Sequence, residues 1–195
     1  MKTLTSLLAA LIACLAAAQG TVIHRIDMSH GSEPYHVTAV LLDSGWELWA
    51  FGSTRSDLLD LEVGRLFPVS KNLLLGGYAI YWPDAKKSFV APALSYNQSI
   101  GTGQLSIFAA IYQPLNGGPH ILLVDDASFI WKQRETSYGL AANYFQFGSD
   151  PASLRVGPTA RLPLGHTTNL KLSYQPLYLV GHGQPTLRVE LSQRF

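Results

Sequence analysis

One short segment collects the residue types that hydrolases use. His30, Ser32, Glu33 and His36 lie in SHGSEPYH, where a serine near a histidine and a carboxylate could form an activated nucleophile. A stretch with Gly and Pro is also an ordinary solvated turn. No wider hydrolase motif surrounds it. We therefore expect no catalytic residue, with a lipid hydrolase as the alternative.

The charged residues are unevenly distributed along the chain. Residues 24–66 hold seven acidic and three basic side chains, whereas residues 150–195 hold five basic and two acidic ones. Groups of opposite sign could neutralise one another in a filled interior or line opposite walls of a pore. The other histidines, His24, His120, His166 and His182, have no ligand spacing, so we expect neither a metal nor a cofactor.

The first residues read as an export signal. Lys2 precedes an apolar stretch from Leu4 to Leu15, and three alanines end at Ala18, so residues 1–18 are predicted to be a cleaved signal peptide. Lipidation at Cys14 is the minor alternative. The remaining residues, 19–195, suit one domain. Removal of Lys2 leaves a formal charge of zero, which argues against nucleic-acid binding.

The elements that must position these charges are short strands. Turn signals recur every 10 to 18 residues, and apolar and polar residues alternate between them, as in residues 154–162 with Arg155 and Arg161 on the polar face. No later apolar run is long enough for a transmembrane helix. The pattern predicts an all-β barrel or sandwich, and a soluble secreted β-barrel remains an alternative.

The last ten residues, TLRVELSQRF, decide between these architectures. Leu187, Leu191 and Phe195 share one face, and the other face is polar. Such a strand resembles the closing strand of bacterial outer-membrane β-barrel proteins. The resemblance is to this class and to no specific subfamily. It implies a closed antiparallel transmembrane β-barrel, periplasmic termini, a surround of outer-membrane lipids, and insertion by a barrel-assembly machinery that reads the C-terminal strand.

Counting back from the tail predicts about twelve strands joined by short turns, or ten if residues 20–34 form a periplasmic arm. Aromatic residues at strand ends are expected at the two membrane interfaces. The predicted interfacial aromatics are Tyr81, Trp82, Tyr112, Tyr144, Tyr178, Trp131 and Phe195.

Alternation also predicts which charges line the lumen. These are Glu47, Asp60, Glu62, Arg155, Arg161, Lys171, Arg188, Glu190 and Arg194. The last strand is expected to pair with the first near Arg25 and Asp27, which would bring the acidic and basic arcs together in one lumen.

The carboxylate pair Asp125-Asp126 breaks the alternation. Adjacent strand residues point to opposite faces, so one carboxylate would face lipid, which is disfavoured. We expect a β-bulge at this place, or a strand that extends beyond the membrane. A cation-binding pair is the alternative, and it would also need a bulge to re-aim one side chain.

A barrel of twelve strands is wider than the eight-stranded barrel that side chains just fill. The sequence therefore predicts a narrow passive channel for small polar or ionic solutes. A structural barrel with a plugged lumen is the alternative. The short external loops leave little room for a large ligand site.

Overall fold

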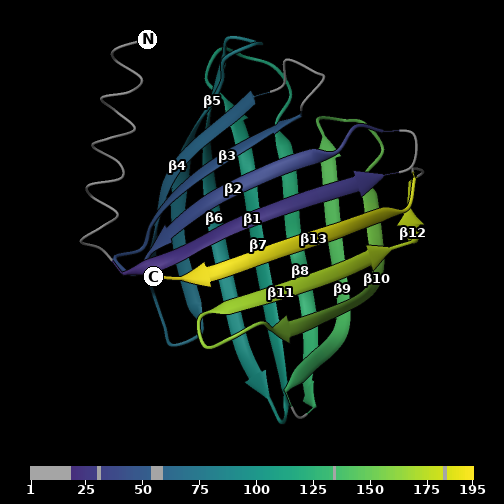
Figure 1. Ribbon diagram of the computed structural model, residues 1–195. Helices are drawn as coiled ribbons and strands as arrows, with labels where there is room; N and C mark the ends of the chain where they lie inside the picture. Colours follow the sequence, from purple (N-terminus) through teal and green to yellow (C-terminus); the bar gives the residue numbers. More distant parts are fainter. Residues whose placement is uncertain (1–18, 30–31, 54–58, 134, 182–183) are drawn as a thin grey trace.

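The computed structural model describes residues 19–29, 32–53, 59–133, 135–181 and 184–195 as one wall of antiparallel strands (Figure 1). The predicted signal peptide lies outside these residues. These residues contain no helical segment with the length and hydropathy that a transmembrane helix needs. The strands are β1 (Gly20–Ser29), β2 (Tyr35–Leu42), β3 (Trp46–Ser53), β4 (Leu59–Pro68), β5 (Leu73–Trp82), β6 (Lys87–Ile100), β7 (Gly103–Pro114), β8 (Ile121–Gln133), β9 (Thr136–Phe147), β10 (Ser153–Pro163), β11 (Thr168–Gln175), β12 (Leu177–Val180) and β13 (Thr186–Arg194).

The strands close into a ring. Each strand from β1 to β10 pairs with the next strand in the sequence. The ring is completed by β11, which pairs with β13, and by β13, which pairs with β1. The short β12 also pairs with β10 and follows β11 after Pro176, which has no N–H to donate. Because β11 and β12 form one interrupted wall strand, the architecture is a closed barrel of twelve strands. The predicted fold class is confirmed.

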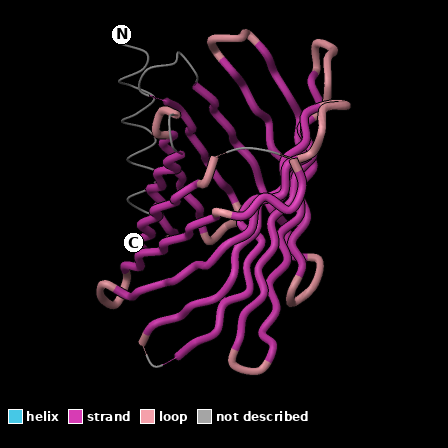
Figure 2. Tube along the Cα trace, turned by 90° about the vertical axis from the view of Figure 1, so that its right-hand side faces the viewer, coloured by secondary structure: helices cyan, strands magenta, loops and turns pink. Residues whose placement is uncertain are grey.

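The two ends of the described chain meet at one rim. The amide of Phe195 donates to the carbonyl of Gly20 at 3.0 Å, and the amide of Gly20 donates back at 3.3 Å. Further along the same pair of strands, Arg25 lies opposite Glu190 and Asp27 opposite Arg188, which confirms the predicted closure of first strand on last. We call this end the terminal rim and the other the far rim; the connections lie at these two ends (Figure 2).

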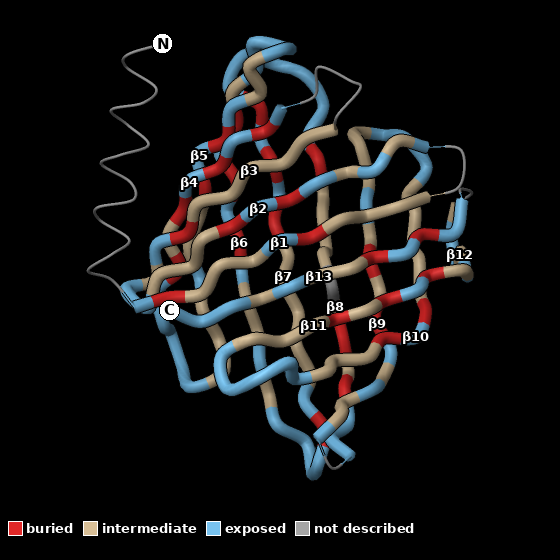
Figure 3. The backbone as a smooth tube through the Cα atoms, in the orientation of Figure 1, coloured by how far each residue is buried: buried red, intermediate tan, exposed pale blue. Residues whose placement is uncertain are grey.

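The wall has an apolar outer face and a mixed inner face. On β4 the outward residues Leu59, Leu61 and Val63 are 41–42% exposed, whereas the alternate residues Asp60 and Glu62 are 9% and 7% exposed. Every wall strand contributes at least one buried residue, and these buried positions run around the barrel between the rims (Figure 3). Period-two alternation thus produces the two faces that the sequence predicts.

Strand β8 contains one irregularity in register. On one side it shifts between Val124 and Ala127 against β9, and on the other side Asp125 pairs with Phe108 while Ser128 pairs with Ser106. One extra residue on β8 is therefore accommodated as a β-bulge at the carboxylate pair. A bulge is the first of the three arrangements that the sequence suggests for this pair, and the cation-binding alternative also requires one.

Candidate functional site: the barrel interior

Four charged side chains form an ion cluster inside the barrel: Arg25 and Asp27 from β1, Arg188 from β13, and Asp125 from β8. Arg188 binds Asp27 through two hydrogen bonds, Nε to Oδ1 at 2.8 Å and Nη2 to Oδ2 at 2.9 Å. Asp125 bridges the two arginines, accepting from Arg25 Nη1 at 2.7 Å and from Arg188 Nη1 at 3.0 Å. Charge-assisted bonds in this number make the cluster a strong local constraint.

The cluster crosses the lumen rather than following the wall. In the ring, β8 is separated from β13 by β9, β10 and the β11–β12 strand. A contact between Asp125 and Arg188 can therefore be made only through the interior. The bulge at Asp125 contributes to this arrangement, because an extra residue bends a strand and re-aims its side chain.

On one side of the ion cluster, the interior under β9, β10 and β11 is filled with polar side chains. Asn143 Nδ2 donates to Gln175 Oε1 at 3.1 Å, and the hydroxyls of Thr159 and Ser173 are 2.7 Å apart. These four residues and Lys171 are all at most 5% exposed. We call this region the polar sector. These bonds satisfy most of the polar atoms named here, but the buried Gln175 Nε2 has no hydrogen-bond partner.

On the other side, the interior under β3 to β8 combines carboxylates with aromatic rings. Glu47 Oε2 accepts from Tyr78 Oη at 2.6 Å and from Trp49 Nε1 at 3.0 Å. Glu62 Oε1 accepts from Tyr112 Oη at 2.8 Å. Among the described residues, no basic side chain pairs with either carboxylate. We call this region the acidic–aromatic sector; its tyrosines supply the donors that arginines supply in the ion cluster.

Removal of one such donor should be measurable. Tyr112→Phe leaves a buried carboxylate oxygen of Glu62 without its donor, so we expect the free energy of unfolding to fall by about 1–2 kcal/mol. Urea titration of the protein refolded in lipid vesicles measures the change. Tyr81→Phe removes the same hydroxyl from a side chain that is 45% exposed on the outer face, and should change stability little. Equal losses in both variants would contradict this role of the Tyr112 hydroxyl.

The predicted lumen charges differ in how far they are exposed. Glu47, Asp60, Glu62, Lys171 and Arg188 are buried, whereas Arg155, Arg161 and Glu190 are partly exposed. Lys171 lies opposite Arg161 on β10 and opposite Glu190 on β13 in the strand register. Arg155 Nη1 donates to Thr186 Oγ1 at 2.6 Å.

Arg194 requires a correction. It shares a strand face with Arg188, but its side chain is 63% exposed and pairs with Asp43 at 2.9 Å. Asp43 lies in the turn between β2 and β3, at the terminal rim. Alternation assigns a face but not a height along the barrel, and Arg194 is too close to the strand end to be enclosed.

Two of the predicted interfacial aromatics also require correction. Tyr112 is 8% exposed and binds Glu62 inside the barrel, and Trp82 packs inside against Phe89, with ring centroids 4.5 Å apart. Both stand at strand ends but on the inner face. Tyr81, Trp131 and Phe195 are 39–45% exposed, and Tyr144 and Tyr178 are partly exposed.

The segment with hydrolase residue types lies at the far rim. His30 is outside the described residues. The Glu33 carboxylate accepts a hydrogen bond from the Ser53 hydroxyl on β3, and the Ser32 amide donates to the Ser29 carbonyl at 3.1 Å, as in a turn. Among the described residues there is no group of three or more His, Cys, Asp or Glu that could hold a metal ion. Nothing in these contacts aligns a base with the Ser32 hydroxyl.

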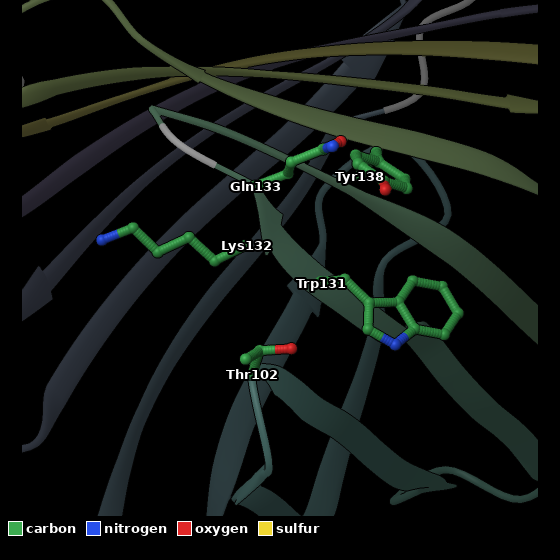
Figure 4. A pocket seen from close by; sticks show the side chains of 5 residues that line it. All are labelled: Thr102, Trp131, Lys132, Gln133 and Tyr138. Atoms are coloured by element: carbon green, nitrogen blue, oxygen red, sulfur yellow. The ribbon is translucent and has the colours of Figure 1, made fainter.

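A pocket of about 410 Å³ lies at the terminal rim, apart from the ion cluster. It is lined by Thr102, Trp131, Lys132, Gln133 and Tyr138. Trp131 and Lys132 are adjacent on β8 and point in opposite directions (Figure 4). The rings of Trp131 and Tyr138 are both exposed, with centroids 6.5 Å apart. This pocket is therefore a feature of the rim and does not continue the interior site.

Comparison with known proteins gives a fold likeness. No model of a protein family matches the sequence, and no curated protein matches it. A KdgM porin, solved alone and in complex with disordered oligogalacturonate, is similar with TM-scores of 0.63 and 0.61 at 10% identity, over 90% of this chain and 99% of the porin. NanC porin is similar with a TM-score of 0.58 at 10% identity, over 89% of this chain and all of NanC. The predicted resemblance to outer-membrane barrels is confirmed at the level of the fold.

Proposed function

We propose that this protein is an outer-membrane β-barrel that acts as a narrow passive channel for small polar or ionic solutes. The observation that carries the proposal is the polarity of the two faces of the wall, which is the reverse of the polarity in a soluble protein. The outer face is apolar, with Leu61, Val63 and Leu140 among many exposed side chains, and the interior holds ionised groups from opposite walls. A soluble monomer rarely exposes so continuous an apolar surface.

The arrangement of interior charge suits small polar solutes. The acids of β4 and the bases of β10 stand six places apart in a ring of twelve strands, so they occupy opposite walls. Opposed walls of unlike charge create a transverse field, and charged pore walls are a common basis of selectivity. KdgM and NanC, which share the fold, are both porins by name, and this supports the proposal.

The location follows from the same faces. Exposed aromatic rings at the terminal rim, including Trp46, Phe67, Trp131, Tyr138 and Phe195, suit a membrane interface. We infer that residues 1–18 direct export and are cleaved, that residues 19–195 form the one mature domain, that the terminal rim faces the periplasm, and that a barrel-assembly machinery inserts the chain through β13.

A sealed structural barrel is the second candidate. The observation that favours it is the ion cluster itself, which joins β8 to β1 and β13 through the lumen. In that case the buried charges would serve to fix the barrel's cross-section and would conduct nothing.

Solute entry into proteoliposomes distinguishes the two candidates. Liposomes that contain the refolded mature protein should swell when diluted into an iso-osmotic solution of glycerol, because a continuous polar path lets glycerol and water enter. Protein-free liposomes provide the baseline. Swelling at the baseline rate, with the barrel shown to be folded by its resistance to SDS before heating, would contradict the channel and leave the sealed barrel.

A further inference from the structure

We propose that Arg65, on the outer face of the barrel near the terminal rim, binds the phosphate group of a membrane phospholipid. This inference rests on the membrane location in the proposed function and does not depend on conduction through the lumen. Three features of Arg65 lead to it: the face on which it lies, its height along the barrel, and the lack of a protein partner for its charge.

Arg65 is an exception on the apolar outer face. The alternate residues Glu62, Gly64 and Leu66 of β4 are buried, so Arg65 lies on the outer face between Val63 and Phe67. Alternation places no other lysine or arginine of the described strands on that face. A positive charge facing lipid is costly at the middle of the bilayer and costs little near the interface.

The height of Arg65 corresponds to the interface. Arg65 is the seventh of ten residues in β4, which ends at the terminal rim, and it lies opposite Trp46, the first residue of β3. Trp46 and Phe67 are 45% and 50% exposed, as aromatic residues at a membrane interface are. An arginine at this height can extend its apolar stem along the wall and hold its charged end among the headgroups.

The guanidinium of Arg65 is held by aromatic rings and not by an anion. Its central carbon lies 4.7 Å from the ring centroid of Phe67 and 5.5 Å from that of Trp46. Among the described residues no carboxylate pairs with it, and its enclosed Nε has no hydrogen-bond partner. Asp43, in the turn before Trp46, pairs with Arg194 instead.

A phosphate fits the donors that remain. Because Nε is enclosed, an anion must be bound by the two terminal nitrogens, and a phosphate can accept two parallel hydrogen bonds from such a planar fork. The rings of Trp46 and Phe67 fix the plane of the fork before the anion arrives. The sequence neighbours of Arg65 therefore supply orientation, and the missing counter-charge must come from outside the protein.

The surroundings of Arg65 favour a phospholipid over a free phosphate ion. Gly77 lies opposite Arg65 on β5 and places no side chain beside it. Toward the middle of the membrane, the outward Val63 and Leu61 are 42% and 41% exposed, so acyl chains can lie along them while the phosphate stays at Arg65. A free ion would gain none of this apolar contact.

Native mass spectrometry of the mature barrel, refolded in detergent with added phosphatidylglycerol, tests the site. Diacylglycerol with the same acyl chains is the probe without a phosphate. We expect the wild type to retain one phosphatidylglycerol and several-fold less diacylglycerol. Arg65→Gln should retain several-fold less phosphatidylglycerol than the wild type. Arg65→Lys should also retain less, because lysine keeps the charge but lacks the two parallel donors.

The matched control is Arg194→Gln, which removes an exposed arginine of the same rim that already has Asp43 as its partner, and which should retain phosphatidylglycerol as the wild type does. Equal retention by the wild type and folded Arg65→Gln, or equal retention of the two lipids by the wild type, would overturn the inference while the membrane location stands. A lipid-free wild-type dimer that Arg65→Gln separates would assign this surface to a second copy of the chain and overturn it too. A mature chain that folds in buffer without detergent and does not enter liposomes would overturn the membrane location as well.

Discussion

Arg188→Met should lower the free energy of unfolding by about 3–5 kcal/mol, the effect usual when one partner of a buried ion pair is removed. Arg188 makes three hydrogen bonds to Asp27 and Asp125, and its side chain is 5% exposed. Methionine keeps much of the volume but leaves two carboxylates to share Arg25. Guanidinium-induced unfolding in detergent micelles, followed by tryptophan fluorescence, measures the loss.

The matched control is Arg194→Met. It breaks an arginine–aspartate pair of the same length, 2.9 Å between Arg194 Nη2 and Asp43 Oδ2, but both side chains are exposed. Exposed pairs contribute about 0–1 kcal/mol because water and salt screen them. If the two variants lost stability equally, the ion cluster would not be the buried constraint described above.

Gly157→Ala should lower the free energy of unfolding by about 3 kcal/mol or more. This is the upper end of the range of about 1–3 kcal/mol that overpacking usually costs. Gly157 faces inward on β10, and a Cβ there would lie 1.8 Å from the carbonyl oxygen of Tyr174 on β11. That oxygen belongs to the backbone of a neighbouring strand, so relief requires the wall itself to move. The same unfolding measurement applies.

Gly165→Ala provides the comparison, since a Cβ at Gly165 would meet no atom within 4 Å. Gly165 lies in the turn between β10 and β11, and its substitution should leave stability near that of the wild type. A near-neutral Gly157→Ala would mean that β10 and β11 are farther apart than the structure describes, which would also loosen the polar sector.

The closing strand and the two faces of the wall could be predicted because they depend on local sequence. Alternation in TLRVELSQRF assigns Arg188 to the interior, and an even number of strands brings β13 beside β1. The bulge at Asp125 could also be predicted from the sequence. In a regular strand with one apolar face, one of two adjacent carboxylates would have to lie on that apolar face.

The partners of Asp125 could not be predicted in this way. Its contact with Arg25 spans 100 positions and crosses the lumen, so it depends on the shape of the barrel's cross-section. Alternation contains no information on that shape. The errors at Tyr112 and Arg194 have a related origin. A place at a strand end predicts an interfacial Tyr112, but its neighbour Ile111 occupies the outer face. The strand face alone predicts a lumen-lining Arg194, but Arg194 stands at the rim.

If the barrel is a channel, a continuous polar path passes through it beside the ion cluster. Single-channel recording of the wild-type protein in a planar bilayer with symmetric KCl tests it most directly. We expect discrete current steps of uniform size as single barrels insert. A bilayer that stays silent after it has incorporated barrels shown to be folded would contradict it.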